Sequence, residues 1–187
     1  MTDRRTFLIA GLSAGATLAA PGLLRAAETP DILAPTRVAF AAGYAPGEIV
    51  ILPRAYMLYH ITAPGEAMRY GIAVAKPGLG FTGAANIRRK VEWPTWRPTP
   101  EMIERNPGEY GRFKGNDERM KGGPGNPLGA RAMYLYQGGK DTYIRIHGTT
   151  QPSSIGRNAS SGCFRMKNQD VIALYDKVPI GTKVTVL

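Results

Sequence analysis

Short runs in which apolar and polar residues alternate, separated by Gly and Pro, dominate the chain from residue 37 onward. In one of them, Tyr70, Ile72 and Val74 would share one face of an extended strand. The same pattern predicts strands at residues 37–41, 48–52, 55–61, 69–75, 132–137, 141–147 and 182–187. We therefore expect a mainly β domain.

The residues between these runs predict how the strands connect. Gly138-Gly139 separates residues 132–137 from residues 141–147, which is typical of a β-hairpin turn. Residues 76–130 hold many Gly and Pro, and we expect them to be mostly irregular, as a long inserted loop. With 23 Gly and 15 Pro in 187 residues, the composition itself favours turns over long helices.

One or two short helices are expected in addition to the strands. Thr99 can cap a helix in which Pro100 takes the first position, where its missing N–H costs nothing. Asn168 can cap a second helix over residues 169–177, whose first turn holds an acidic residue and whose last turn holds a lysine.

The N-terminus has the pattern of an export signal. Arg4-Arg5 is followed by the uncharged residues 7–20 and then by small residues near Ala27. The uncharged run is shorter than the roughly 20 residues that span a bilayer, so the membrane is expected to matter only during export. The twin arginines resemble a twin-arginine signal. We expect a signal at residues 1–27, a linker or loose terminus at residues 28–45, a domain at residues 46–187, and a location in the periplasm or cell envelope.

The net charge of +10 first suggests nucleic acid, but its distribution argues against that partner. Residues 1–27 include three arginines and one aspartate, so the remaining chain carries +8. Its basic residues are scattered and interleaved with acids, with no nucleic-acid motif. An anionic envelope polymer suits this charge better, and plain solubility explains most single lysines as well. One Cys and two His exclude a disulfide framework and a Cys/His zinc site, and we expect no metal and no cofactor.

The lone cysteine and one histidine are the candidate reactive groups. Alternation puts Ile144 and Ile146 in the core and turns His147 toward a groove at the strand end. Cys163 follows Gly162, which suits a sharp turn whose backbone N–H groups converge beside the sulfur. A thiol near an imidazole can become a reactive thiolate. An inert buried thiol and a hydrogen-bonding histidine are the alternatives, and His60 is read as structural.

These residues lie within a longer recognisable pattern. His147-Gly148-Thr149, followed by residues 160–166 (Ser-Ser-Gly-Cys-Phe-Arg-Met), resembles the signature of the L,D-transpeptidase (YkuD-type) catalytic domain. The resemblance extends to residues 93–98, 125–129, 168–170 and 178–182. It spans roughly residues 46–187 and implies a β-sandwich or barrel-like fold.

The resemblance implies a peptidoglycan cross-linking enzyme without cofactors. In the family, a cysteine attacks a stem tetrapeptide, D-Ala leaves, and an amine of a second stem or of an envelope-protein lysine takes the acyl group. By match, Cys163 is the nucleophile, His147 is the general base and acid, and the Gly148 carbonyl orients the imidazole. Backbone amides would form the oxyanion hole, from Ser161, Gly162 and Cys163. Carbapenem-type β-lactams are expected to acylate the cysteine.

Three further positions carry open expectations. Arg165 shapes the site, meets a substrate carboxylate, or forms an ordinary surface charge pair. Trp96, with Trp93, belongs either to a loop over the groove or to ordinary aromatic packing. The family motif commonly has His where this chain has Ser161, which matters only if that side chain takes part in acyl transfer. An L,D-carboxypeptidase that uses water, another cell-wall hydrolase, a non-catalytic peptidoglycan-binding module and a generic basic binding protein remain as alternatives.

Overall fold

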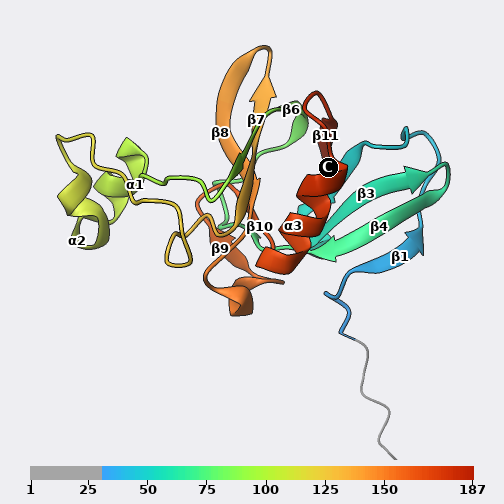
Figure 1. The fold of residues 1–187 in the computed structure, drawn as a ribbon, viewed down its shortest axis with the longest axis horizontal. Helices are drawn as coiled ribbons and strands as arrows, with labels where there is room; N and C mark the ends of the chain where they lie inside the picture. The colour runs from blue at the N-terminus through green and yellow to red at the C-terminus, as the bar shows by residue number, and fades with distance from the viewer. Residues whose placement is uncertain (1–30) are drawn as a thin grey trace, which may run out of the picture.

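The computed structural model describes residues 31–187 (Figure 1). The expected signal at residues 1–27 and the first three residues of the expected linker lie outside this range. The strands are β1 (Thr36–Ala39), β2 (Ile49–Leu52), β3 (Met57–Ala63), β4 (Glu66–Gly71), β5 (Val74–Ala75), β6 (Gly83–Glu92), β7 (Arg131–Gln137), β8 (Lys140–His147), β9 (Asn158–Ser160), β10 (Phe164–Arg165) and β11 (Lys183–Val186). The helices are α1 (Pro100–Arg105), α2 (Pro107–Tyr110) and α3 (Asn168–Lys177), with 3-10 turns η1 (Pro53–Ala55), η2 (Gly111–Phe113) and η3 (Pro152–Ser154). The prediction of a mainly β fold with a few short helices is confirmed.

Nine of the strands form one open sheet in the order β1-β4-β3-β2-β11-β6-β7-β8-β10, and β5 pairs with β9 separately. The sheet does not close, so the architecture is sandwich-like rather than a barrel. Helix α3 packs against β7 and β8 (Figure 1). The main core lies between these layers and contains fully buried aliphatic side chains, among them Ile49, Ile87, Leu135, Ile146 and Leu174.

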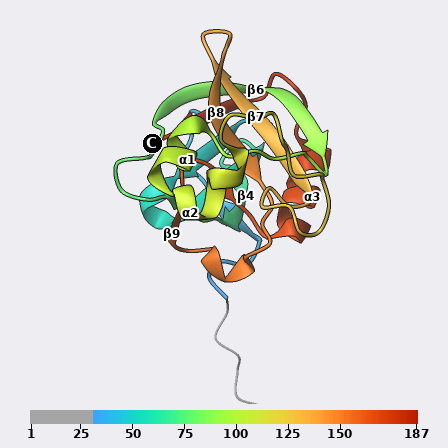
Figure 2. The same ribbon diagram turned by 90° about the vertical axis from the view of Figure 1, so that its left-hand side faces the viewer.

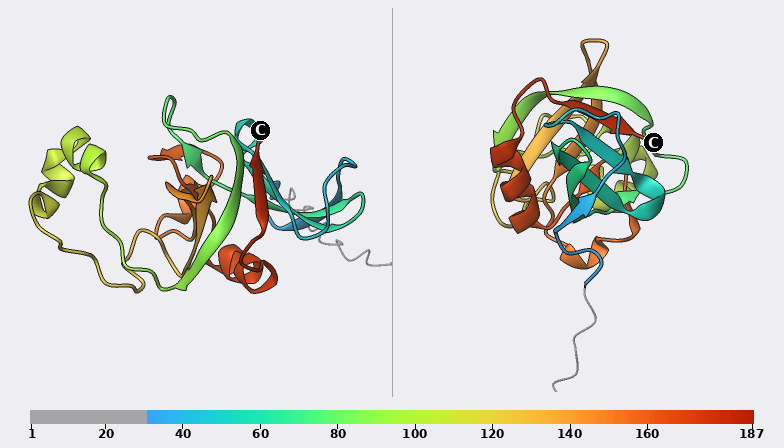
Figure 3. Two further views of the ribbon diagram at one scale, coloured as in Figure 1. Left: turned by 90° about the horizontal axis from the view of Figure 1, so that it is seen from above. Right: turned by 90° about the vertical axis from the view of Figure 1, so that its right-hand side faces the viewer.

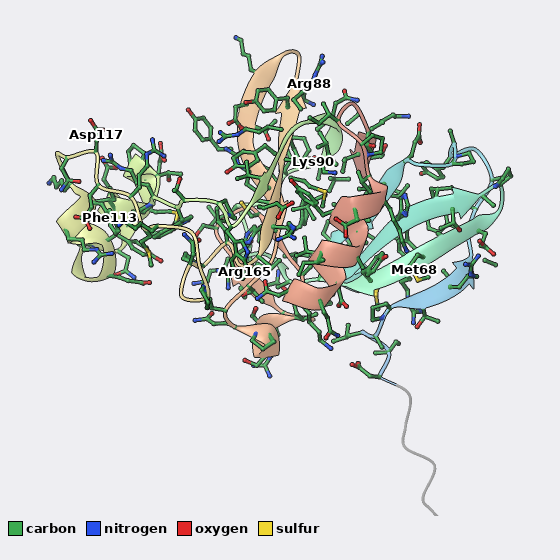
Figure 4. The ribbon with its side chains drawn as sticks, in the orientation of Figure 1. Met68, Arg88, Lys90, Phe113, Asp117 and Arg165 are labelled. Carbon is green, nitrogen blue, oxygen red and sulfur yellow. The ribbon has the colours of Figure 1, made fainter. Side chains whose placement is uncertain are left out.

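Strand β6 corrects the expectation that residues 76–130 are mostly irregular. Its ten residues lie near the middle of the sheet, between β11 and β7. Ala85 and Ile87 point into the core, but a run of basic residues hides the alternation in the sequence. The lysine of that run, Lys90, lies over the Tyr175 ring and donates to the Tyr175 and Val178 carbonyls (Figure 4). The basic run is therefore part of the packing between β6 and the end of α3.

The predicted hairpin and the first predicted helix are confirmed. Gly138 and Gly139 join β7 to β8 with φ angles of 57° and 78°, which suit glycine. Helix α1 begins at Pro100, and the Thr99 hydroxyl accepts a hydrogen bond from the Met102 N–H. The cap predicted for the other helix is wrong: Asn168 is its first residue and does not cap it.

Residues 31–45 differ from the expected loose terminus. Strand β1 pairs with β4, and the Leu33 carbonyl accepts from the Gly71 N–H. Arg69 donates to the Ile32 carbonyl. A side chain at Gly71 would collide with Leu33, so this close approach requires a glycine. In the described range, no helix is long and apolar enough to cross a membrane.

The inserted loop forms a separate projection, here called the lobe (residues 93–129), on the body (residues 31–92 and 130–187). The lobe carries α1, α2 and η2 away from the sheet (Figures 1 and 3) and lies in front of it in the side view (Figure 2). Trp96 and Met120 exchange backbone hydrogen bonds and so join the two legs of the lobe. The Trp96 ring packs edge-on against Tyr110 and Phe113, which gives the lobe a small aromatic core.

Candidate active site

Strand pairing sets the cysteine loop (residues 161–163) beside β8, the strand that ends at His147. Strand β10 is parallel to β8, with Phe164 opposite Ile146 and Arg165 opposite His147. Cys163 directly precedes β10, so the same ladder that fixes Arg165 also fixes the cysteine. In the described range no hydrogen bond joins the thiol to the imidazole. The thiol donates to the Tyr143 carbonyl instead, at 3.7 Å.

The imidazole of His147 is buried and held through one ring nitrogen. His147 is 4% exposed, and its Nδ1 lies 2.6 Å from the Gly148 carbonyl oxygen. A carbonyl can only accept, so Nδ1 carries the proton and Nε2 is the acceptor nitrogen of the neutral ring. The Gly148 carbonyl thus lies where the sequence analysis expects it. Its catalytic role stays a prediction.

Asn168 holds the backbone around His147, and the sequence analysis missed this role. Its Oδ1 accepts from the Ala130 N–H (3.0 Å) and the Thr149 N–H (3.2 Å). A Cβ at Gly148 or at Gly129 would collide with this same oxygen, so both glycines are required for the close approach. The side chain read as a helix cap instead ties the start of β7 to the turn after β8. Its residue type suggested capping, and no local pattern reveals this long-range contact.

Burial opposes charge on both reactive groups. Burial lowers the pKa of His147 to about 4, with a smaller lowering from the Arg165 and Arg145 charges, while the hydrogen bond to the Gly148 carbonyl and the backbone of Leu128 act in the opposite direction. Burial also raises the pKa of Cys163, although the Arg145 N–H and the two arginine charges favour the thiolate. At neutral pH the resting pair is therefore a thiol and a neutral imidazole. A thiolate already formed on Cys163 in the resting protein, as a cysteine near a histidine would suggest, is therefore disfavoured.

The loop before the cysteine is braced by Ser160. Its hydroxyl donates to the Cys163 carbonyl (2.5 Å) and accepts from the Gly162 N–H (3.2 Å). Gly162 has φ of 138°, a conformation that L side chains rarely adopt. The Gly162 amide, expected in the oxyanion hole, is thus already engaged. No hydrogen bond within residues 31–187 engages the N–H groups of Ser161 or Cys163. The oxyanion role expected of these two groups stays a prediction.

Tyr143 is a second residue near the thiol that the sequence analysis did not select. It has φ of 58°, unusual for a residue with a side chain, and the β7–β8 register shifts just beside it. This bend presents the Tyr143 carbonyl to Cys163 and leaves its ring 71% exposed. Strained backbone of this kind is concentrated at functional sites. A regular strand pattern gives no signal for it.

The remaining predicted residues lie in different places. Arg165 is on β10, opposite His147, and its charge lowers the pKa of both Cys163 and His147. Trp96 packs inside the lobe, so its substrate role stays a prediction while its packing role is visible. His60 is buried in β3, within the sheet and away from β8. No group of three or more His, Cys, Asp or Glu in the described range is arranged to hold a metal ion.

The family model and the curated relatives that match this chain are described as L,D-transpeptidases. Residues 46–186 match the sequence model of the YkuD family, described as the L,D-transpeptidase catalytic domain. A Bacillus subtilis protein, "Putative L,D-transpeptidase YkuD", is 35% identical over 146 residues, which are 78% of each chain. An Escherichia coli protein, "Probable L,D-transpeptidase ErfK/SrfK", is 37% identical over 123 residues. These cover 65% of this chain but 37% of the relative, so this chain spans well under half of that protein.

A solved structure from Brucella melitensis is similar over nearly its whole length. It is 59% identical, with a TM-score of 0.57, and the match covers 86% of this chain and 96% of the other. That protein is named as a probable carnitine operon oxidoreductase, whereas the family model and the curated relatives are described as L,D-transpeptidases.

Proposed function

Because the chain belongs to the L,D-transpeptidase (YkuD-type) catalytic domain family, we propose that it is a cysteine acyltransferase acting on peptidoglycan stem tetrapeptides. The observation that carries the proposal is the β8–β10 pairing, which sets the lone cysteine beside the strand that ends at His147. A buried imidazole with a fixed tautomer next to a cysteine loop suits acyl transfer.

The proposed reaction begins with the neutral pair. As the Cys163 sulfur attacks the carbonyl carbon of the third stem residue, its proton passes to Nε2 of His147. The amides of Ser161 and Cys163 stabilise the oxyanion. The C–N bond to D-Ala then breaks, His147 returns the proton to the leaving amine, and a thioester remains. An amine then attacks the thioester and gives a proton to Nε2 of His147. As the C–S bond breaks, His147 passes that proton to the sulfur, which restores the thiol.

The acceptor in the second step is part of the proposal. An amine of a second stem gives a cross-linked dimer, and a lysine of an envelope protein gives a protein adduct. Water would give a tripeptide, which is the carboxypeptidase alternative. All three use the same acyl-enzyme, so the products distinguish them and the site geometry does not.

Export is proposed on the sequence alone. The pair Arg4-Arg5 and the uncharged run after it lie outside the described residues. We expect the protein in the periplasm, and we expect replacement of both arginines by lysine to retain it in the cytoplasm, measured by cell fractionation and immunoblotting. Periplasmic protein in unchanged amount would contradict the twin-arginine route.

Mass spectrometry of tetrapeptide muropeptides treated with the purified protein tests the function. We expect release of D-Ala, with a dimer, a tripeptide or an adduct as the second product. Cys163→Ala and His147→Gln should abolish the release. His60→Gln is the matched control, because it removes the other buried histidine without touching the site. Absence of any Cys163-dependent product under varied conditions would contradict the enzyme hypothesis, and a bound but unchanged peptide would indicate a binding module.

A further inference from the structure

One side chain connects the lobe to the cysteine loop. Arg105, in the last turn of α1, donates from Nη2 to the Ser161 Oγ at 2.9 Å, although 56 residues separate them. Both residues are exposed. Helix α1 packs against α2 and buries Ile103, and its hydrogen bond to Ser161 places this guanidinium two residues from Cys163.

A second arginine follows the same loop, on β10. Arg165 is opposite His147 in the β8–β10 ladder, two residues after Cys163. Arg105 thus contacts the residue two positions before Cys163, and Arg165 lies two positions after it. Burial and a hydrogen bond with Glu109 raise the pKa of Tyr110 to about 12, and the charges of Arg165 and Arg105 both oppose that rise.

These two cations lack a carboxylate partner at ion-pair distance. The ion pairs of the described residues involve other arginines and lysines, such as Arg97 and Arg145, and none includes Arg105 or Arg165. Glu101, one turn earlier in α1, feels the Arg105 charge only weakly. Two guanidinium groups, one exposed and one half-buried, with no ion-pair partner among residues 31–187 and beside a candidate nucleophile, can form a receptor for an anion.

The substrate of the proposed reaction carries a suitable anion. The terminal carboxylate of a tetrapeptide lies on the residue directly after the bond that breaks, three bonds from the carbonyl carbon that Cys163 would attack. Resting on the proposed function, we infer that Arg105 and Arg165 bind the terminal carboxylate of the donor stem, and that Arg105 is the specificity-determining residue that the lobe supplies. The Ser161 hydroxyl accepts from Arg105 and so holds this guanidinium beside the cysteine loop.

Binding of matched peptides to Cys163→Ala protein tests the inference without turnover. The probes are a tetrapeptide muropeptide with a free terminal carboxylate and the same peptide with a terminal carboxamide, measured by calorimetry. In the Cys163→Ala parent we expect the free acid to bind about tenfold more tightly. Adding Arg105→Gln should bring the ratio of the two affinities, free acid to carboxamide, close to one, and should leave the affinity for the carboxamide unchanged. Lys114→Gln, which removes an exposed positive charge from the same lobe, should leave the ratio intact.

Two results overturn the inference: a parent without acid preference, or an Arg105→Gln variant that keeps the parent's ratio and its melting temperature. Ser161→Ala provides a second variant that keeps both charges, and it should weaken the acid preference less than Arg105→Gln. The proposed function fails in a different way, when protein with an intact Cys163 releases no D-Ala from a tetrapeptide that it binds. If D-Ala is released but Arg105→Gln leaves the acid-to-carboxamide affinity ratio unchanged, only the inference is wrong.

Discussion

The body and the lobe hold their residues in place by different means. In the body, a nine-stranded sheet, a buried aliphatic core and α3 fix His147 and the cysteine loop through ladders and buried hydrogen bonds. In the lobe, one aromatic cluster and one backbone pair support short helices that contribute a single hydrogen bond to the cysteine loop. Under the proposed function, we infer that the body positions the reacting groups and that the lobe contributes to substrate selection.

Truncating one core side chain in each region tests whether the lobe and the body unfold independently. Phe113→Ala should destabilise the lobe by about 3 kcal/mol, because the ring is 2% exposed and packs on Trp96. Hydrogen exchange should accelerate in the lobe and stay unchanged in β7. The matched change Leu135→Ala, in β7, should lower the melting temperature of the whole protein. Equal global losses from both variants would show that lobe and body unfold together.

A smaller effect tests how the body holds the His147 turn. Asn168→Ala leaves the Ala130 and Thr149 N–H groups without an acceptor, and we expect about 2 kcal/mol of lost unfolding free energy. D-Ala release should fall as well, because the turn carries the imidazole. Asn86→Ala, which removes an exposed hydrogen bond to Gly181, is the control in denaturant titration. Equal losses from the two variants would contradict the positioning role of Asn168.

The pH profile tests the buried, neutral state of the pair. His147 must be neutral to accept a proton, and burial lowers its pKa to about 4, so kcat/KM should stay level as the pH falls from 7 toward 4. A histidine with an ordinary pKa near 6.5 would lose about thirtyfold by pH 5. Since the pKa of Cys163 is raised, alkylation of the free thiol should be slow at pH 7 and increase only in alkaline solution. An acid limb near pH 6.5 would contradict the account.

The smallest effect belongs to the lobe. Thr99→Ala removes the hydroxyl that caps α1 and should cost that helix about 1 kcal/mol. Amide exchange in α1 should increase, and the preference for a free terminal carboxylate should weaken slightly, because Arg105 lies in the last turn of this helix. No change in α1 exchange would show that the rest of the lobe, rather than the cap, holds the helix.

Local sequence signals predict the parts of the fold that depend on near neighbours. The Gly138-Gly139 turn and the Thr99 cap follow from the conformations that these residues favour, and both are confirmed. Strand β6 was missed because Arg89 and Lys90 resemble a solvated charge run, although they stack on tyrosine rings. Asn168 was misassigned for a similar reason: its partners lie 38 and 19 residues away, and only the folded chain brings them together.

For the site, the motif identifies which residues matter, and the fold determines their state. The residue pattern led to Cys163 and His147, and the resemblance gave each a role and added Gly148. Neither the pattern nor the resemblance indicates that burial keeps the Cys163 thiol and the His147 imidazole neutral, or that Ser160 engages the Gly162 amide. The contact between Arg105 and the cysteine loop depends on how the lobe folds back, for which the sequence offers no local signal.

Intact-protein mass spectrometry with peptide mapping tests the central claim most directly. A tetrapeptide donor with its free amines acetylated, incubated with the protein and quenched in acid, should leave an adduct equal in mass to that tetrapeptide minus D-Ala. We expect that adduct on the peptide containing Cys163, and we expect it to be absent from Cys163→Ala protein. D-Ala release without any Cys163 adduct, or an adduct on another residue, would contradict the account.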